Sequence, residues 1–357
     1  AGRRLREGAV KQVGIVGAPY SGKTTFFNAL THAGATGASG KANVAIVPVP
    51  DERVDVLSRL HESRKSVYAQ LKFVDVVGLA KGAGAGEGLS GQMLGQLREV
   101  DALAVVVRAF GDDADPTAEL GDLLLELQLA DLTAIAGAAD RAARKARVGD
   151  KAAGAEVAAL ERAKSVLDDG QLLRTELWEP AELVVFRNFA PLTLKPLVVV
   201  INVDDDATAA TPASAAVDGL AGADSVTIVV PARLEAEVGG MDAADAAELL
   251  AEFGVATRAL PQVVAAAYRG IGLLTFLTAG EDESRAWEVR AGATAPEAAG
   301  VIHSDLQRGF IRAEVVGYDE LVAAGSWDKA KAAAQLRVEG KDYVVAEGDV
   351  MNIRFAV

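Results

Sequence analysis

Residues 17–25, GAPYSGKTT, carry the spacing that is best suited to chemistry. Gly17, Gly22, Lys23 and Thr24 satisfy the pattern G-x-x-x-x-G-K-[ST]. In such a loop, backbone N–H groups and the start of the following helix point at phosphate oxygens. The lysine ammonium adds a charged donor, and the hydroxyl is offered to Mg²⁺. The spacing therefore predicts a loop that binds the phosphates of a nucleotide.

The flanking residues predict the two elements that position this loop. Val13 to Val16, VGIV, reads as a short buried strand, and the segment TTFFNALTHAG from Thr24 has apolar residues at helical spacing before a glycine. Strand, loop and helix follow in the order that phosphate binding requires.

A second motif, DVVG at 75–78, follows a predicted strand. In the pattern D-x-x-G the aspartate holds Mg²⁺ through water and the glycine N–H senses the γ-phosphate, roles that fall on Asp75 and Gly78. Glycine then recurs at every second position from 82 to 88, which leaves the backbone many conformations. We expect a segment that a γ-phosphate orders and hydrolysis releases; the alternative is an ordinary flexible surface loop.

A third set of residues is placed to read the base. Asn202, Val203 and Asp205 end a strand at the position where many GTPases carry N-K-x-D. The aspartate of that motif accepts from guanine and repels the N1 acceptor of adenine, so Asp205 keeps GTP open as well as ATP. Ala232, after another strand, is expected to offer its N–H to the base edge.

The rest of the chain predicts an α/β fold with further helical and α+β parts. Residues 71–79, 101–110, 194–203 and 225–232 read as Val- and Ile-rich strands of a mostly parallel sheet that is buried on both faces. Residues 118–182 are rich in Ala, Leu and charged side chains and predict a helical hairpin with its tip near 149–156. Short strands and Gly-rich turns after about residue 275 predict a small α+β domain.

Composition narrows the function classes. The 357 residues include no cysteine, so disulfides, thiolate zinc sites and a cysteine nucleophile are excluded, and a reducing cytoplasm is expected. The three histidines do not have the spacing of metal ligands. A net charge of −14 argues against a protein that binds nucleic acid through an overall positive charge. No apolar run approaches the roughly 20 residues of a membrane span, and AGRRLREGAV is too short and charged for a signal peptide, so a soluble protein without a membrane partner is expected.

Three longer stretches resemble the YchF family of Obg-like ATPases, within the TRAFAC class of P-loop NTPases. They are FVDVVGLAKGAGAGEGL at 73–89, AWEVRAGATAPEAAGVIHSDLQRGFIRAEV at 286–315 and EGKDYVVAEGDVMNIRFAV at 339–357. The resemblance implies a G domain at 10–115 and 191–274, an inserted α-helical coiled-coil arm at 116–190 and a C-terminal β-grasp (TGS) domain at 275–357. It also implies Mg²⁺-dependent ATP hydrolysis and association with ribosomes.

Carried over residue by residue, the resemblance implies a complete nucleotide site. Lys23, Asp75 and Gly78 are expected to act in catalysis, and Thr24, Ser39 and Asp75 at Mg²⁺. The nucleotide is expected to contact Tyr20, Ser21, Gly22, Lys23, Thr24, Thr25, Asn202, Val203, Asp205 and Ala232.

Departures from the family pattern bear on rate and on cation dependence. Leu79 stands where small GTPases place the glutamine that orients water, and Val105 replaces the family's suggested catalytic histidine, so slow intrinsic turnover is expected. Tyr20 replaces an asparagine that can help to bind a monovalent cation. Two alternatives stay open: a GTPase of the same fold, and a nucleotide-gated ribosome- or RNA-binding module with negligible hydrolysis.

One basic cluster lies on the predicted hairpin. Arg141, Arg144, Lys145 and Arg147 are expected to contact rRNA phosphates through counterion release, with the TGS domain as a second contact. The alternative is a solvated helix face.

Overall fold

The computed structural model describes residues 10–32, 44–76, 89–148, 150–205 and 212–356. The described residues form two compact units. The first lies within 11–47 and 72–270, and the second within 48–71 and 271–357.

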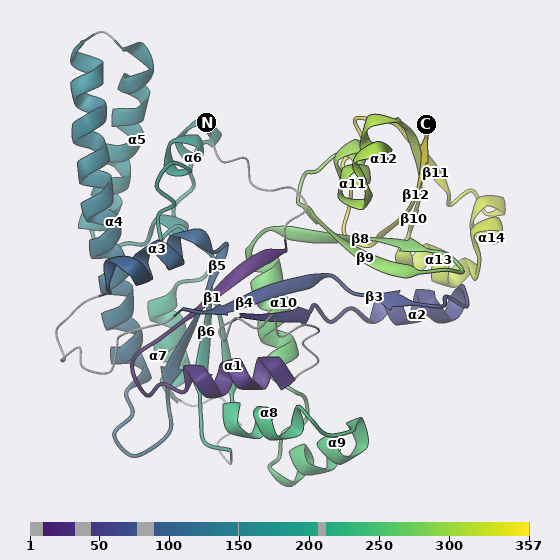
Figure 1. Cartoon of the computed structure of the whole chain (residues 1–357), viewed down its shortest axis with the longest axis horizontal. Coiled ribbons are helices and arrows are strands. Elements are labelled where there is room, and N and C mark those ends of the chain that lie inside the picture. The colour runs from purple at the N-terminus through teal and green to yellow at the C-terminus, as the bar shows by residue number, and fades with distance from the viewer. Residues whose placement is uncertain (1–9, 33–43, 77–88, 149, 206–211, 357) are drawn as a thin grey trace. The chain divides into compact units, whose positions relative to one another are not determined.

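The first unit is built on a six-stranded sheet with the order β2-β4-β1-β5-β6-β7 (Figure 1). The pairs β1–β5, β5–β6 and β6–β7 are parallel. The carboxyl ends of these strands therefore meet at one edge of the sheet, where loops can gather groups from distant parts of the sequence. The strands are β1 (Lys11–Val16), β2 (Val44–Pro48), β4 (Gln70–Asp75), β5 (Ala102–Arg108), β6 (Leu197–Asn202) and β7 (Val226–Val230).

Burial explains why the central strands were recognisable from sequence. Every residue of β6 is buried, and so are the first six of the seven residues of β5, as continuous Val and Ile runs predict for a sheet covered on both faces. The α/β fold with a mostly parallel sheet is confirmed. The sequence pattern did not single out β2. The residues of this edge strand alternate between half-buried and buried, and the strand ends at a proline.

Helices cover both faces of this sheet. One face carries a core cluster that joins side chains of β5 and β6 to those of three helices, α3, α4 and α7. The alternate residues of the same strands are buried as well, and α10 contacts β5, β6 and β7. The helices are α1 (Lys23–His32), α3 (Gly91–Glu99), α4 (Pro116–Arg147), α5 (Lys151–Asp168), α6 (Pro180–Phe186), α7 (Pro212–Ala221), α8 (Ala232–Val238), α9 (Ala243–Glu252) and α10 (Leu260–Gly270), with a 3₁₀ turn at Leu173–Thr175.

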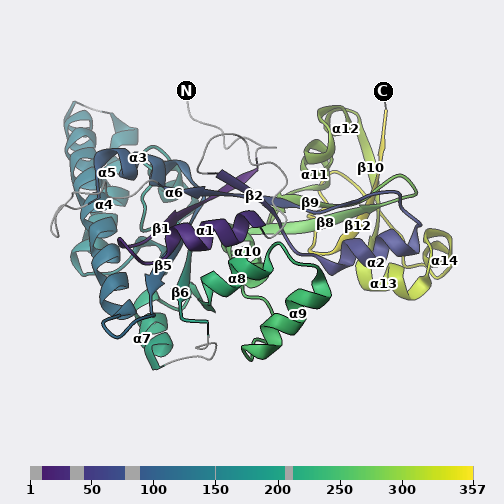
Figure 2. The same cartoon turned by 60° about the horizontal axis from the view of Figure 1, so that its bottom comes forward.

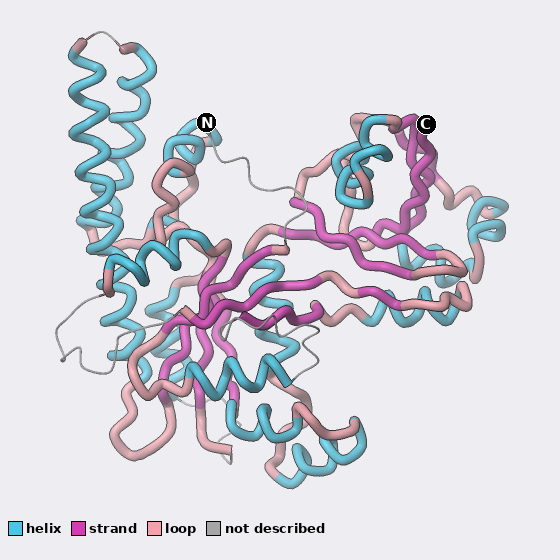
Figure 3. Tube along the Cα trace, in the orientation of Figure 1, coloured by secondary structure: helices cyan, strands magenta, loops and turns pink. Residues whose placement is uncertain are grey.

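The helices α4 and α5 form the predicted hairpin, in which the shorter α5 lies beside the C-terminal part of α4 (Figures 1 and 3). Asp115 and Asp150 cap the two helices, each accepting from backbone N–H groups of the first turn. The helices share an alanine- and leucine-rich core that also takes in Phe186 of α6. Alanine and leucine have high helix propensity, which is why the stretch is recognisable as helix from its sequence.

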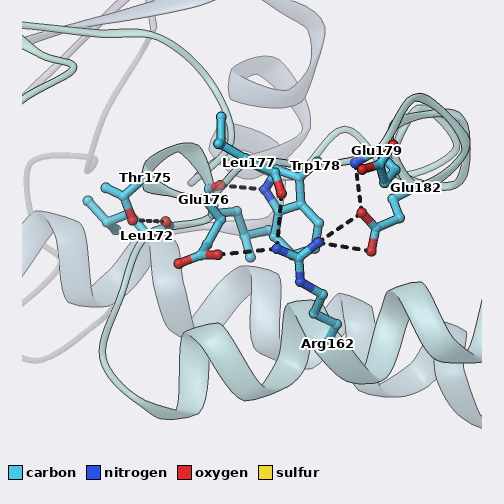
Figure 4. A network of polar contacts seen from close by, with 9 residues as sticks. Arg162, Leu172, Thr175, Glu176, Leu177, Trp178, Glu179 and Glu182 are labelled. Atoms are coloured by element: carbon cyan, nitrogen blue, oxygen red, sulfur yellow. Dashed lines mark hydrogen bonds and ion pairs between the residues drawn. The ribbon is translucent and has the colours of Figure 1, made fainter.

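A polar network fastens the chain that returns from the hairpin to the sheet (Figure 4). Arg162 of α5 lies over the ring of Trp178, 4.2 Å from its centroid, and donates two bonds of 2.9 and 3.1 Å to Glu182. It also reaches Glu176 and the carbonyl of Leu177. One guanidinium thus ties α5 to both the 3₁₀ turn region and α6.

A buried carboxylate fastens α4 to the entry of β6. Asp131 is almost fully buried and accepts from the N–H groups of Leu192 and Thr193 and from the Thr193 hydroxyl, at 2.7 to 3.0 Å. Burial raises the pKa of Asp131, while these donors act in the opposite direction. The contact fixes the base of the hairpin relative to the sheet.

The second unit contains a sheet with the order β11-β10-β12-β8-β9-β3. The first and last strands of the C-terminal stretch, β8 and β12, pair in parallel, as in the β-grasp module that the resemblance implies, and β10 pairs antiparallel with β12. In Figures 1 and 2, α11 and α12 lie on one side of this sheet and α2 and α13 on the other. The elements are α2 (Glu52–Leu60), β3 (Ser66–Val67), β8 (Leu273–Ala279), β9 (Ser284–Arg290), α11 (Ala295–Ile302), α12 (Ser304–Arg308), β10 (Phe310–Gly317), α13 (Tyr318–Ala324), α14 (Trp327–Ala332), β11 (Arg337–Glu339) and β12 (Asp349–Phe355).

The segment between β2 and β4, which carries α2 and β3, groups with this second unit, whereas the expected boundaries placed it in the G domain. The strand β3 pairs in parallel with β9, and α2 packs on β8 and β9. Arg53 of α2 pairs with Asp51 at 2.7 Å and with Glu347 at 2.6 Å. The difference has a physical reason: the domain boundary depends on strand pairing between residues more than 200 positions apart, as in Ser66 with Ser284.

Within the described residues, no helix combines the length and the apolar character that crossing a bilayer requires.

Lys195, just before β6, gives the fold a pH dependence. Its ammonium donates to the carbonyls of Arg98 and Val100, and burial lowers its pKa from 10.5 to about 8, although Asp101 and Asp131 act the other way. Between these two pKa values the unfolded chain binds more protons than the folded chain, so folding becomes more favourable as pH rises.

We predict that the wild-type chain gains about 2 kcal/mol of unfolding free energy relative to Lys195→Met between pH 7 and pH 9.5. Urea unfolding at several pH values measures this difference. The exposed Lys329→Met serves as the control and should show no such trend. A difference between wild type and Lys195→Met that stays constant with pH contradicts the prediction.

Candidate nucleotide-binding site

The loop between β1 and α1 is a tight bend that ends in a helix N-terminus. Ser21 N–H donates to the Ala18 carbonyl at 3.3 Å, and Phe26 N–H donates to the Gly22 carbonyl at 2.9 Å, where the helical bonds begin. Gly22 has φ of +86°, a left-handed conformation, and a Cβ on Gly17 would lie 2.2 Å from the Val106 carbonyl oxygen. Both pattern glycines are therefore required by the backbone path itself.

Lys23, the first residue of α1, folds its ammonium back over this bend. Nζ donates to the carbonyls of Gly17 at 2.8 Å and Ala18 at 2.6 Å, two of the bonds that its three N–H donors can make. Burial lowers the pKa of Lys23, while the nearby carboxylates of Asp75 and Glu119 raise it. The loop thus gathers a partly desolvated cation and helix N–H groups, an arrangement that favours an anion.

Asp75 ends β4 beside this cation. Burial raises its pKa and the charge of Lys23 lowers it, so the structure places the two predicted residues within electrostatic reach of each other. Burial thus destabilises the charged form of each residue, and a bound divalent cation and polyphosphate would compensate both.

Asn202, at the end of β6, joins the phosphate loop to the loop after β7. Its Nδ2 donates to the Ser21 carbonyl at 3.0 Å, and its Oδ1 accepts from Ala232 N–H at 3.2 Å. A Cβ on Gly22 would lie 2.0 Å from Nδ2. The buried amide therefore holds the bend of the loop in place, and Gly22 is what lets it approach.

The residues expected at the base are engaged with the protein. Val203 is buried in the sheet core, and its N–H donates to the Val230 carbonyl. Ala232 gives its N–H to Asn202 rather than to a base edge. Asp205 accepts from Leu234 N–H at 3.1 Å and from Arg233 Nε at 2.5 Å. Asp205 is thus paired with an arginine whose side chain is 81% exposed.

The other loop residues differ in accessibility. Tyr20 is 88% exposed and has φ of +64°, a conformation that asparagine adopts more readily than tyrosine. The Ser21 hydroxyl oxygen is buried without a partner in the described part of the chain. Thr24 is exposed and Thr25 is half-buried at the start of α1. An orphaned hydroxyl and an exposed threonine at a helix N-terminus suit a site that takes phosphate and a cation.

Three of the expected positions lie outside the described residues: Ser39, Gly78 and Leu79. Val105 is described and is fully buried in the middle of β5, paired with Val16 and Val199. The position that resembles the family's histidine thus serves the sheet core.

The donor set fits Mg²⁺. Thr24 offers a hydroxyl at the start of α1, and Asp75 offers a carboxylate whose charged form burial destabilises. Hard oxygen donors with water in the remaining positions are what Mg²⁺ prefers.

Comparisons with known proteins find relatives over nearly the whole chain. The family model YchF-GTPase_C, described as a protein of unknown function (DUF933), matches residues 273–356, and the model MMR_HSR1, described as 50S ribosome-binding GTPase, matches 12–136. The "Ribosome-binding ATPase YchF" of Haemophilus ducreyi is 39% identical over 96% of this chain and 99% of its own. The chain belongs to the YchF family.

Other YchF relatives come from distant organisms. The "Ribosome-binding ATPase YchF" of Bacillus subtilis is 39% identical over 96% of this chain and 99% of its own. "Obg-like ATPase 1" of rice is 35% identical over 97% of this chain and 92% of its own. The solved "Structure of the Schizosaccharomyces pombe YchF GTPase" superposes with a TM-score of 0.88 at 29% identity and covers 99% of this chain and 100% of its own.

Two residues near the YchF site were missed in the sequence. Glu119, in the first turn of α4, accepts from the backbone N–H of Arg108 at 2.9 Å, and its charge raises the pKa of Lys23. Arg233 pairs with Asp205. Arg233 directly follows Ala232, so the sequence already placed it near the expected base-binding residues. Its pairing with Asp205 could not be predicted, because it depends on the loops after β6 and β7 lying together.

The Asn202 contacts predict that this side chain supports phosphate binding without touching phosphate. Asn202→Ala removes two buried hydrogen bonds, so we expect a loss of about 2 kcal/mol in unfolding free energy and about tenfold in affinity for Mg·ATP. Urea unfolding and calorimetric titration measure the two effects. The exposed Asn28→Ala on α1 is the matched control, and equal affinities for Asn202→Ala and wild type contradict the supporting role.

Proposed function

We propose that this chain is a Mg²⁺-dependent nucleoside triphosphatase that hydrolyses ATP to ADP and phosphate and works as a slow switch on ribosomes. The observation that carries the proposal is the bend at 17–22, with Lys23 folded over it and Asn202 holding it. The relatives named ribosome-binding ATPases over nearly the whole chain support the activity and the partner.

The residues of the loop bind and orient the triphosphate. Lys23 exchanges its loop carbonyl acceptors for β- and γ-phosphate oxygens, and N–H groups at the start of α1 point at the same group. Thr24 and Ser39 are proposed to hold Mg²⁺ directly and Asp75 through water; when bound there, the ion would supply charge neutralisation at the phosphates. Gly78 is proposed to sense the γ-phosphate through its N–H.

ATP is proposed as the preferred substrate. Guanine reading needs a carboxylate whose oxygens are free to accept, and both oxygens of Asp205 already accept from Leu234 and Arg233. A GTPase remains the second candidate, because the Schizosaccharomyces pombe relative is titled a GTPase. Competition of ATP and GTP against one fluorescent nucleotide decides between them, and tighter binding of GTP would reject the ATP preference.

Turnover is proposed to be slow. The apolar side chain of Leu79 cannot orient water, and Val105 is buried in the sheet core. Neither position therefore supplies a group that polarises a nucleophile. Phosphate release with and without ribosomes tests this proposal. Release that rises with ribosomes supports a ribosome-stimulated ATPase, and release at background in both cases favours the nucleotide-gated binding module.

The ribosome contact is proposed to involve the tip of the hairpin. Arg141, Arg144, Lys145 and Arg147 are exposed in the last two turns of α4 and give an acidic chain a local basic face. Such a cluster binds rRNA phosphates by releasing counterions. The TGS domain is proposed as a further contact, and a cytoplasmic location is proposed because the ribosome is the proposed partner.

Lys23→Ala tests the phosphate site. The change removes the charged donor, so we expect affinity for Mg·ATP to fall by at least about a hundredfold while the domain stays folded. Calorimetric titration measures the affinity, and circular dichroism with thermal unfolding checks the fold. Lys164→Ala on α5 is the control. Unchanged affinity in folded Lys23→Ala would reject the site assignment.

Removing the basic cluster should weaken ribosome binding in a salt-dependent way. For the triple change Arg144→Gln, Lys145→Gln and Arg147→Gln, we expect binding to fall and the slope of log affinity against log salt to drop by about 2 to 3. Cosedimentation at several salt concentrations measures both. A control triple, Lys164→Gln, Arg187→Gln and Arg269→Gln, has the same charge change within 72–270, outside both the basic cluster and the TGS domain. An identical loss in both triples would contradict a specific contact.

A further inference from the structure

An ion pair covers the carboxylate that would read guanine. Arg233, the second residue of α8, donates from Nε to Asp205 Oδ2 at 2.5 Å, and its Nη2 pairs with the same oxygen. Leu234 N–H donates to the other oxygen, Oδ1, at 3.1 Å. The carboxylate is 9% exposed, whereas the arginine side chain is 81% exposed and lies on the solvent side.

A carboxylate at this place affects the two purines in opposite ways. Guanine presents N1–H and N2–H₂ donors to it, whereas adenine presents an acceptor at N1 and no 2-amino group. An unpaired carboxylate therefore favours guanine and repels adenine. A guanidinium on the carboxylate cancels both effects, because it occupies the acceptor oxygens and compensates the negative charge.

We propose that Arg233 is a specificity-determining residue that shields Asp205 and so shifts base selection from GTP toward ATP. The inference rests on the proposed nucleotide site. It concerns only the ratio of the two affinities, in which the common triphosphate and Mg²⁺ contributions cancel.

The surroundings keep Arg233 over Asp205 without making it part of the fold. Asp204 and Glu237 add electrostatic attraction, and the Arg233 side chain is 81% exposed. Replacement of an exposed arginine of this kind leaves the folded state nearly unchanged. Asp205 keeps its bond to Leu234 N–H when the arginine is removed, so its carboxylate stays at the base side of the loop.

The test is a double-mutant cycle read as the ATP:GTP affinity ratio. Mg·ATP and Mg·GTP are each competed against one fluorescent nucleotide on wild type, Arg233→Gln, Asp205→Asn and the double variant. We expect Arg233→Gln to shift the ratio toward GTP by about tenfold, the effect of freeing one charged acceptor. We expect the same change to shift nothing when Asp205 is already Asn.

Two controls make the result specific. Arg354→Gln removes an exposed arginine that pairs with Glu314 at 2.9 Å and should leave the ratio unchanged. Arg233→Lys keeps the positive charge but loses the planar guanidinium with its two parallel donors. Its ATP:GTP affinity ratio should therefore lie between those of wild type and Arg233→Gln. A ratio unchanged in Arg233→Gln, or an equal shift in the Asp205→Asn background, overturns the inference alone. If wild type binds neither nucleotide, the proposed function fails with it.

Discussion

The bend between β1 and α1 is the constraint on which the site depends, and a single amide side chain holds it. Asn202 donates to Ser21 and accepts from Ala232, so it ties together three loops at the carboxyl edge of the parallel sheet. A side chain on Gly22 would displace that amide, and one on Gly17 would collide with β5. The glycines of the motif thus serve the packing of the edge as much as the approach of a phosphate.

Charge explains why such a site accepts a polyanion together with a cation. Burial lowers the pKa of Lys23 and raises that of Asp75, so each charged form is less stable there than in water. The orphaned Ser21 hydroxyl adds an unsatisfied polar group to the same bend. A magnesium polyphosphate would compensate the charges of Lys23 and Asp75 together, which couples ligand binding to the charge state of the loop.

Local patterns predicted the parts of the structure that depend on neighbours in sequence. The phosphate loop, the buried runs of β5 and β6 and the two hairpin helices follow from residues within a few positions of one another. Long-range pairing was not predictable in this way. The pairing of β3 with β9, the burial of Val203 and the Arg233–Asp205 contact each depend on segments distant in sequence. Ala232 was expected to offer its N–H to a base; in the structure this N–H donates to Asn202, a contact between two segments distant in sequence.

The central claim is that this bend and Lys23 hold the nucleotide phosphates. A crystal structure of the full chain with Mg²⁺ and a non-hydrolysable ATP analogue tests it most directly. The account predicts a β-phosphate within the loop, with Lys23 Nζ moved from the carbonyls of Gly17 and Ala18 to phosphate oxygens. A nucleotide bound elsewhere, with Lys23 still on those carbonyls, would contradict it.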